Sequence, residues 1–486
     1  MTVIRRALII SFVERYGLVA LALVSNILVA RLLTPAEIGL YSVSLAIISI
    51  GQVVRDFGIG SYLIQEKNLT EAHIRTAFGI SLTIGFGLFG IFHIGAPHIS
   101  RFYNNEDMSE LIKLISLNFL LLPFCSISVS LLRREMQFGR LMFVNLTGGV
   151  VGFIVTIYSA LTGHGAESPA FGAIASNVSI GITSWLARKA HKMLLPGFSE
   201  WRSIARFGGQ SSLAAIVTSI AMDINDLVVG KVMDFTSVAI MSRAQGLMNL
   251  FHRDTMLAIR NVAFPAFAKA YREGENLEER YIKSVAAVTA VAWPFYGFIA
   301  LYPLEILRVM FGPQWDAAAE LVPIFSLAGA IASTFTLIPS VVLATGRVAI
   351  TTRMELILQP VRAGLIISAA IFYKTVWACA IGFLIAFSLA VPLFYYFKAK
   401  CIRNNFKSLL KELWLSAKIT TFCLALPAGL DYYLTNKGFQ LANFWHLFSL
   451  GCLTGFMWLI ALFLFKHPLT AALSFQKTAA KNPFSA

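Results

Sequence analysis

The stretch Val376-Trp-Ala-Cys-Ala-Ile-Gly-Phe-Leu-Ile-Ala-Phe387 decides the fold class, because it is apolar without any alternation of polar residues. Phe456-Met-Trp-Leu-Ile-Ala-Leu-Phe-Leu-Phe465 has the same character. Lipid offers no partner for backbone N–H and C=O groups, so a membrane segment must be a helix or belong to a closed barrel. Barrel strands alternate apolar and polar residues. Both stretches therefore predict membrane-spanning helices.

The composition extends this prediction to the whole chain. Its 486 residues are 57% hydrophobic and only 13% charged, and the mean hydropathy is +0.71. Soluble domains carry about 25% charged residues. So few charges cannot cover a surface that faces water, so we expect an all-α, polytopic membrane protein.

Apolar runs long enough to cross a hydrocarbon core of ~30 Å recur along the chain and predict about fourteen transmembrane helices. The first follows Arg5 and Arg6, and we expect it to remain uncleaved because no small-residue cleavage site follows it. The expected limits are Leu8–Ala30, Ile38–Leu63, Ile74–Ala96, Leu111–Leu132, Leu141–Leu161, Ala170–Ala187, Ser211–Val229, Ser237–Ala258, Val285–Leu304, Leu321–Ala344, Thr351–Phe372, Val376–Phe397, Ile419–Leu434 and Phe444–Phe465.

The connections between these spans alternate between basic and nearly uncharged. Basic residues gather near Arg133–Arg140, Arg188–Arg206, Lys269–Lys283 and Lys398–Lys418, whereas the other connections hold one basic residue each or none. The positive-inside rule places the basic connections and both termini in the cytoplasm. The net charge of +15 is therefore a topology signal, and we do not expect nucleic-acid binding. The loops are also too short for a nucleotide-binding domain.

A repeat at an offset of 200 residues divides the chain. Asn26–Ser42 aligns without gaps on Asp226–Ser242, and the basic residue, the following apolar pair and the polar turn match in kind. Six spans separate the copies, so both enter the membrane in the same direction and predict two parallel, pseudo-symmetric six-helix lobes. We assign residues 1–200 to the N-terminal lobe (spans 1–6) and 201–412 to the C-terminal lobe (spans 7–12). Residues 413–486 hold two additional helices and a cytoplasmic tail.

Ionisable side chains within the spans are candidate functional residues, because charge at bilayer depth is costly and normally faces a cavity or a partner. Many lie on the first two spans and on spans 7 and 8, which correspond to them through the repeat. A cleft between the lobes would lie there. The charged residues are Glu14, Arg15, Arg55, Asp56, Asp223, Asp226, Arg243, Arg253, Asp254, Glu355 and Arg362, and the neighbouring amides are Asn26, Asn225 and Asn249.

A structural interpretation stands beside the functional one at several of these positions. Glu14 and Arg15 could bridge helices near the cytoplasmic surface, and Arg55 with Asp56 could end the second span. Arg253 and Asp254 could pair with other groups near the cytoplasmic end, and Glu355 with Arg362 could be an internal ion pair. The functional interpretation is favoured for Asp223, Asp226 and Arg243 because they lie well inside their segments.

Neither a metal site nor a cofactor is expected. The five cysteines are scattered and form no CxxC motif, and the eight histidines lack metal-ligand spacing. Gly85–Gly90 fits a GxGxxG pattern, but it lies within a span with no strand before it, so dinucleotide binding is not expected.

Several segments resemble the Wzx-type polysaccharide flippases of the multidrug/oligosaccharidyl-lipid/polysaccharide exporter superfamily. Asn26–Tyr41 is similar to the end of their first span and Asp56–Gln65 to the end of their second. In the second lobe the resemblance is to the subgroup of colanic-acid-type exporters, and it extends through about Ala344. It rests on Arg206–Gly209, Asp226–Lys231, Met241–Leu247 and Phe264–Phe267. Val238–Met241 departs from the Gly and Tyr that the family usually shows there, which concerns helix packing.

The resemblance implies a transporter, not an enzyme, that moves undecaprenyl-diphosphate-linked oligosaccharide units across the bacterial inner membrane by cation-coupled alternating access. A diphosphate needs charge compensation, and guanidinium groups suit phosphate oxygens. We therefore expect Arg15, Arg55, Arg243 and Arg253 to contact diphosphate, Asn26 and Asn249 (with Asn225) to contact sugar, and Glu14, Asp223, Asp226 and Asp254 to couple H⁺ or Na⁺.

Two other functions remain open. A cation-coupled multidrug antiporter of the same superfamily would favour an acidic cavity, whereas the first two spans here hold at least as many arginines as carboxylates. A membrane-embedded polysaccharide polymerase or ligase typically needs a large periplasmic loop, which the span limits do not provide. Lipids, a polysaccharide polymerase and glycosyltransferases are the expected partners.

Overall fold

The computed structural model describes residues 2–187, 195–205, 223–436 and 444–470, and every regular element in those ranges is helical. The predicted all-α, polytopic fold class is therefore confirmed. The chain divides into two compact units, Met1–Ala239 and Ile240–Ala486. The lobe limits that the repeat predicts, at residues 200 and 412, remain a prediction.

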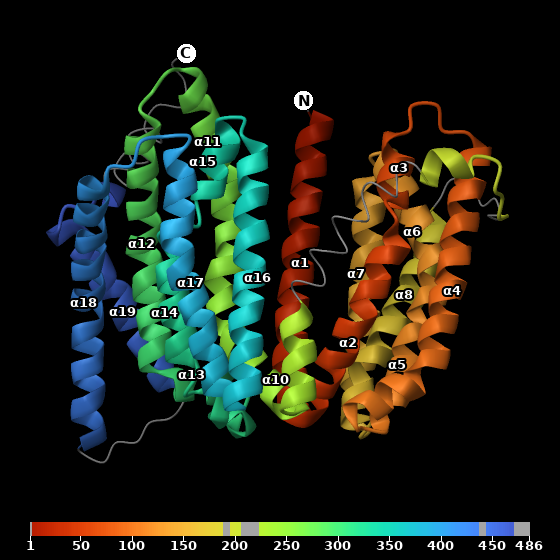
Figure 1. Ribbon diagram of the computed structural model, residues 1–486, viewed down its shortest axis with the longest axis horizontal. Coiled ribbons are helices and arrows are strands. Elements are labelled where there is room, and N and C mark those ends of the chain that lie inside the picture. Colours follow the sequence, from red (N-terminus) through yellow and green to blue (C-terminus); the bar gives the residue numbers. More distant parts are fainter. Residues whose placement is uncertain (1, 188–194, 206–222, 437–443, 471–486) are drawn as a thin grey trace. The chain divides into compact units, whose positions relative to one another are not determined.

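Unit 1 is built on long helices that pack along one another (Figure 1). The pairs α7–α8, α1–α7, α6–α8, α4–α5 and α4–α6 make its main contacts. Its elements are α1 (Thr2–Leu32), α2 (Pro35–Asp56), α3 (Ile59–Gln65), α4 (Glu71–Tyr103), α5 (Asp107–Ser116), α6 (Asn118–Arg134), α7 (Phe138–Leu161), η1 (Gly165–Glu167) and α8 (Ser168–Ala187), with helical residues 201–205 and 223–232.

Unit 2 begins within α10 and contains the predicted extra helices, of which α18 packs on α12 and α19 on α18. Figure 1 shows its long helices running side by side. Its elements are α10 (Phe235–Asn249), the π-helix η2 (Leu250–Thr255), α11 (Met256–Arg272), α12 (Leu277–Leu301), α13 (Pro303–Met310), η3 (Pro313–Ala318), α14 (Val322–Ser333), α15 (Ile338–Ala344), α16 (Val348–Tyr373), α17 (Val376–Ala399), α18 (Phe406–Asn436) and α19 (Phe444–Leu464).

Twelve helical segments of the described residues are long and apolar enough to cross a membrane. They match the predicted spans 1–6 and 9–14, and the two stretches that predicted helices lie in α17 and α19. The predicted seventh span, Ser211–Val229, falls mostly outside the described residues. The eighth is a continuous helix of α10, η2 and α11 that is not among the twelve. The total of about fourteen therefore remains a prediction.

Some predicted spans are broken helices. The second breaks where Phe57 and Gly58 both adopt left-handed backbone angles (φ 35° and 63°), so α3 continues the segment after α2. Pro and Gly are tolerated in membrane helices where neighbours satisfy the freed backbone groups, but hydropathy does not register such breaks. The fourth span likewise divides into α5 and α6, and the tenth into α14 and α15.

The repeat recurs in the backbone. Helix, two-residue break and new helix fall at residues 33–34 in the first copy and 233–234 in the second. Thr34 caps α2 in a capping box with Glu37, whose Oε2 accepts from the Thr34 N–H at 2.7 Å. At the equivalent position Asp234 Oδ1 accepts from the Ser237 N–H at 2.6 Å. Both copies thus stop and restart the helix by the same side-chain cap.

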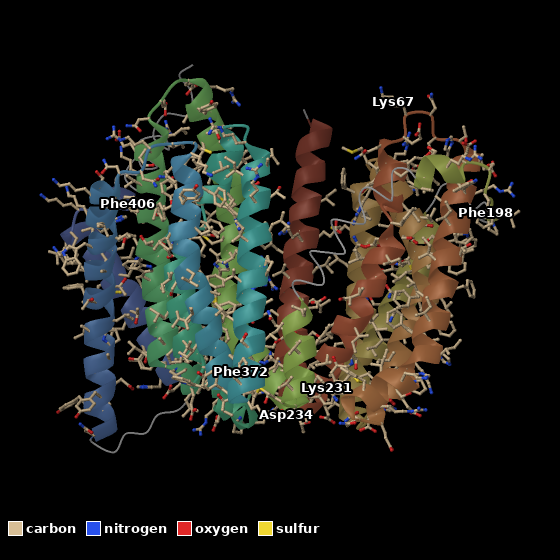
Figure 2. The ribbon with its side chains drawn as sticks, in the orientation of Figure 1. Lys67, Phe198, Lys231, Asp234, Phe372 and Phe406 are labelled. Atoms are coloured by element: carbon tan, nitrogen blue, oxygen red, sulfur yellow. The ribbon has the colours of Figure 1, made fainter. Side chains whose placement is uncertain are left out.

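The second copy's corner docks on the far end of α4 within unit 1. The Tyr103 hydroxyl donates to the Leu227 carbonyl at 3.1 Å, and its ring stacks on Phe235 with 6.2 Å between centroids. The Lys231 ammonium donates to the Phe102 carbonyl. In Figure 2, Lys231 and Asp234 lie at the opposite end of this unit from Lys67. These contacts fix the segment that carries Asp223 and Asp226.

Gly39 allows an even closer approach at the same corner. A Cβ atom at this position would lie 1.7 Å from the carbonyl oxygen of Phe235. Only glycine lets α2 and the start of α10 touch through their backbones.

Candidate functional site

A polar cluster in unit 1 joins helix α2 to residues 223–232. The Ser49 hydroxyl donates to Asp223 Oδ2. Asp226, three residues on, lies on the same helix face and is half-buried, as is Asp223. Asn225 is 8% exposed, and its Oδ1 has no hydrogen-bond partner among the described residues. Two carboxylates, an amide oxygen and a hydroxyl thus come from α2 and residues 223–232, and these are groups that a cation or protons can bind.

Helix α1 carries three of the candidates, Glu14, Arg15 and Asn26. Glu14 Oε1 accepts a hydrogen bond from Asn145 Nδ2 of α7 at 2.6 Å. This contact is of the helix-bridging kind that the structural interpretation expects. Arg15 and Asn26 are exposed side chains on the same helix. Both can therefore be reached by a ligand at this surface.

Arg55 and Asp56 form an ion pair at the end of α2. The Arg55 side chain is 11% exposed, whereas that of Asp56 is 69% exposed. The pair immediately precedes the left-handed Phe57 and Gly58. The arginine is therefore mostly enclosed by unit 1, and its charge is balanced by its neighbour.

Arg243 lies between two aromatic rings of the connection after α12. Its guanidinium carbon is 4.4 Å from the ring centroid of Phe311 and 4.5 Å from that of Trp315. Trp315 is fully buried in η3, and Asp316 beside it receives a bidentate hydrogen bond from Arg308. Both rings make cation–π contacts with the guanidinium, and guanidinium N–H groups are donors suited to oxygen atoms.

The π-helix η2 carries the remaining charged candidates of the eighth span. Arg253 and Asp254 pair at 2.9 Å, with side chains 72% and 53% exposed. Asn249 is the last residue of α10, directly before the π-helix. Short π-helical segments are rare and frequently occur at functional sites. Both charged groups and the amide lie where a ligand could reach them.

The structure adds two residues to Glu355 and Arg362. Arg260 of α11 and Arg362 of α16 both act electrostatically on His252 in the π-helix, and Glu355 acts on both arginines. Arg260 lies beyond the predicted limit of the eighth span, Ala258, because α11 continues to Arg272. Arg260 lies seven residues after Arg253, so the two fall on nearly the same helix face. A longer limit for the eighth span would have included Arg260 among the candidates.

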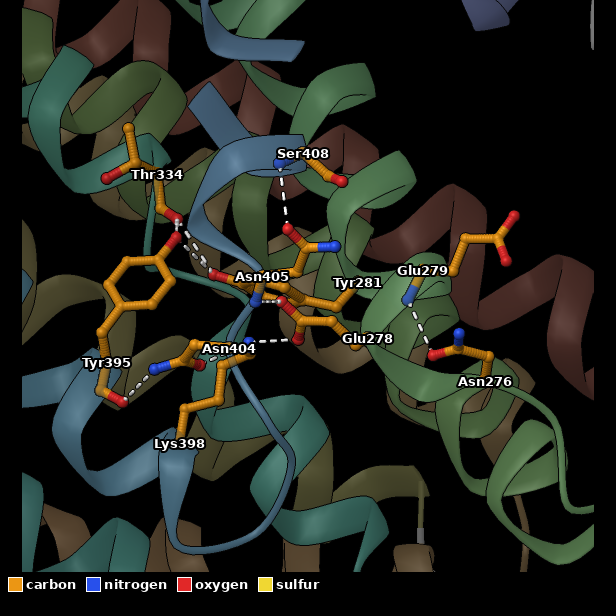
Figure 3. Close-up of polar contacts among 10 residues, drawn as sticks. All are labelled: Asn276, Glu278, Glu279, Tyr281, Thr334, Tyr395, Lys398, Asn404, Asn405 and Ser408. Carbon is orange, nitrogen blue, oxygen red and sulfur yellow. Dashed lines mark hydrogen bonds and ion pairs between the residues drawn. The ribbon is translucent and has the colours of Figure 1, made fainter. Parts of the chain in front are cut away.

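A second polar network surrounds a lysine that the sequence places in a basic connection. Lys398 is fully buried near the end of α17, and its ammonium donates to Glu278 and, at 2.8 Å, to Asn404 Oδ1 (Figure 3). The same ammonium lies 4.4 Å from the ring centroid of Tyr281 and 5.6 Å from that of Tyr395. Lys398 is therefore not a solvated charge.

This network ties four segments of unit 2 together. Glu278 Oε1 accepts from the Asn405 N–H at 2.9 Å, and Asn405 Oδ1 accepts from the Ser408 N–H at the start of α18. The Tyr395 hydroxyl donates to the Thr334 carbonyl at 2.8 Å. The start of α12, the end of α14, the end of α17 and the start of α18 are thus joined through buried polar contacts.

Comparison with known proteins finds a matching family and relatives along most of the chain. A family described as polysaccharide biosynthesis protein matches residues 28–320. The lipopolysaccharide biosynthesis protein WzxC of Escherichia coli K12 is 23% identical over 466 residues, covering 93% of this chain and 92% of that protein. The teichuronic acid biosynthesis protein TuaB of Bacillus subtilis is 20% identical, covering 80% and 82%.

Solved structures show the same fold at low sequence identity. A lipid II flippase, MurJ, in an inward closed conformation has a TM-score of 0.72 at 16% identity, covering 95% of this chain and 100% of that one. An inward-facing multidrug resistance transporter of the MATE family has a TM-score of 0.62 at 14% identity, covering 80% and 95%.

Proposed function

The chain belongs to the polysaccharide biosynthesis protein family, and from this we propose that it flips undecaprenyl-diphosphate-linked oligosaccharide units across the bacterial inner membrane. The proposal rests on two kinds of relative, one similar in sequence and one in fold, that each match nearly the whole chain. A polysaccharide biosynthesis protein matches in sequence over 93% of the chain, and a lipid II flippase matches in fold over 95%. The twelve membrane-spanning candidates make it a multi-pass membrane protein.

Transport by alternating access requires groups that bind the substrate while a second set of groups takes up and releases a cation. For the diphosphate, Arg15 and Arg253 have exposed side chains. Arg243 lies against Phe311 and Trp315, and Arg55 is available only if it leaves Asp56. We assign these four arginines to the diphosphate.

Sugar hydroxyls need amide partners, and the coupling cation needs carboxylates. The exposed Asn26 and the half-buried Asn249 are suited to sugar hydroxyls. Asp223 and Asp226 are the best placed of the coupling candidates, because they face each other's charge on one helix turn beside Ser49. Glu14, which accepts a hydrogen bond from Asn145, and Asp254, which pairs with Arg253, complete the set. The coupling ion is H⁺ or Na⁺.

The protein is proposed to act as a transporter, not an enzyme, with both termini cytoplasmic and with a polysaccharide polymerase and glycosyltransferases as partners. The second candidate function is multidrug antiport, which the TM-score of 0.62 to a MATE transporter favours. Organic cations would be repelled by the arginines assigned above. The sequence relatives named for polysaccharides decide between the two.

The test is flipping of lipid-linked oligosaccharide in proteoliposomes, scored by access of an added glycosidase to the glycan. Wild type should expose glycan that control liposomes keep protected. Arg15→Ala and Arg253→Ala should slow flipping by at least about tenfold, which is the loss of one charged hydrogen bond. Normal flipping by both variants would overturn the diphosphate assignment, and drug transport without glycan flipping would overturn the function.

The coupling role is tested in the same vesicles. With an imposed H⁺ or Na⁺ gradient, wild-type flipping should accelerate, and Asp223→Asn with Asp226→Asn should abolish the acceleration while leaving gradient-free flipping. An unchanged response to both gradients in the double variant would contradict this assignment.

A further inference from the structure

The chain between α8 and the second repeat copy contains a short segment, residues 195–205, that is docked on unit 1. Three hydrogen bonds hold it. The Gly197 N–H donates to the Arg75 carbonyl at 2.9 Å, and the Glu200 N–H donates to Thr76 Oγ1 at 3.3 Å. The hydroxyls of Ser203 and Tyr62 are 3.0 Å apart. The docked segment is therefore fixed to the start of α4 and to α3.

Close packing reinforces these bonds. A Cβ atom on Gly79 of α4 would lie 2.4 Å from the Gly197 carbonyl oxygen, so the two backbones touch where only glycine fits. Ile204 is fully buried and joins the core formed by Ile59, Leu63, Phe78 and their neighbours. One side of the docked segment thus belongs to the interior of unit 1.

The other side of the docked segment is apolar and exposed. Leu195, Phe198 and Trp201 have 54%, 55% and 52% of their surface exposed. Figure 2 shows Phe198 at the outer edge of the unit, pointing away from the helices. Arg202 lies with its guanidinium 5.8 Å from the ring centroid of Trp201. Three large apolar side chains within seven residues need a partner other than water.

The position of the docked segment identifies that partner. Arg75 and Thr76, to which it is bonded, lie in the first turns of a membrane-spanning helix that begins at Glu71. The start of a membrane-spanning helix is where a chain passes between the headgroup layer and the hydrocarbon. Tryptophan is enriched at this depth, and exposed basic residues attract anionic headgroups. Lys67, Arg75, Arg133 and Arg202 are exposed basic residues of these segments or of the neighbouring end of α6.

We propose that residues 195–205 are a membrane-surface anchor that inserts Leu195, Phe198 and Trp201 into the headgroup layer of anionic lipid. The backbone bonds to α4 hold these side chains at a fixed depth relative to unit 1. Exposed apolar residues, flanking arginines and attachment at the end of a membrane span all meet in this one segment. The inference does not depend on the transported substrate.

The test measures the depth of single spin labels in the full-length protein. Cys401 and Cys452, the two cysteines that are not buried, are changed to Ser. Phe198→Cys and Trp201→Cys then carry a nitroxide in proteoliposomes with or without phosphatidylglycerol. Lys67→Cys is the matched control, because Lys67 is exposed at the same end of unit 1. Retained helicity and monodisperse elution confirm that each variant is folded.

The accessibility of each label to oxygen and to a water-soluble nickel chelate reports its depth. We expect the labels at 198 and 201 to favour oxygen several-fold more than the label at 67, and to move deeper when phosphatidylglycerol is present. Equal access of the nickel chelate to all three positions would overturn the proposal. Exclusion of both reagents from 198 and 201 would also overturn it, since it would indicate contact with protein. A depth that ignores lipid charge would refute the preference for anionic lipid.

Discussion

The buried ion pair between Lys398 and Glu278 allows a sharp test of what holds unit 2 together. Lys398 is completely enclosed and the Glu278 side chain is only 13% exposed. Removing one member of a buried pair typically costs about 3–5 kcal/mol, because the other charge remains buried and uncompensated. Lys398→Met keeps the length and the apolar stem of the side chain but leaves the Glu278 carboxylate with the Asn405 N–H as a remaining donor. We therefore expect destabilisation near the lower end of this range.

The double variant tests whether Lys398 and Glu278 stabilise unit 2 as an ion pair or as two independent residues. Glu278→Gln alone leaves the Lys398 ammonium buried against Asn404 and two tyrosine rings. Lys398→Met combined with Glu278→Gln leaves no charge uncompensated. Its destabilisation should fall short of the sum of the single variants by about 0.5–3 kcal/mol, the usual coupling between contacting residues.

The measurement is thermal unfolding of the purified protein in detergent, followed by size-exclusion chromatography after heating. Lys400→Met is the control, because Lys400 is an exposed lysine two residues along, 4.5 Å from the Tyr396 ring centroid. An exposed substitution should change stability by no more than ~0.5 kcal/mol. Equal shifts in midpoint temperature for Lys398→Met and Lys400→Met would refute the reasoning, as would strict additivity in the double variant.

Three further changes probe the other contacts. Gly39→Ala should abolish expression of folded protein, since its Cβ would collide with a backbone carbonyl, whereas Gly95→Ala meets nothing within 4 Å and should be silent; fluorescence-detected elution checks both. Arg243→Lys should lower the unfolding midpoint through the loss of stacking worth about 1 kcal/mol, and the exposed Arg253→Lys should not. The hydrogen bond from its arginine partner lowers the pKa of Asp316. The contribution of this carboxylate to stability is thus complete above the ordinary Asp pKa of about 3.9 and fades as pH falls through the lowered pKa. The difference in midpoint between wild type and Asp316→Asn should shrink in that range, and a difference that grows on acidification would contradict the assignment.

The helical spans could be predicted from sequence because hydropathy integrates over a whole segment. The twelve spans found agree with prediction even where Pro294 or Pro392 lies inside a helix. A hydropathy scale, however, gives every charged residue the same free-energy cost of burial, whether or not it has a partner. It therefore placed Lys398 in a solvated connection, although Glu278, 120 residues away, allows the lysine to be buried.

In the candidate site, too, the charged residues could be predicted but their partners could not. The rule that charges inside spans face something identified Asp223 and Arg243, and the structure gives each a partner side chain, Ser49 for the first and aromatic rings for the second. The partners themselves could not be predicted, because Phe311 lies in a connection that looked extramembranous. The π-helix that carries Arg253 has no sequence signature, since it depends on the packing of its neighbours.

The repeat explains why the two copies need not share one role. Residues 33–34 and 233–234 break their helices at the same register although one cap is Thr34 and the other Asp234, so the same backbone break forms with different side chains. The equivalent positions Asn26 and Asp226 also differ: the first copy has an exposed amide there and the second a half-buried carboxylate. An amide is neutral at any pH, whereas the charge of a carboxylate is neutralised by a proton or balanced by a bound cation. We therefore propose that Asp226 of the second copy serves coupling, whereas Asn26 at the equivalent position of the first copy offers a neutral hydrogen-bonding group.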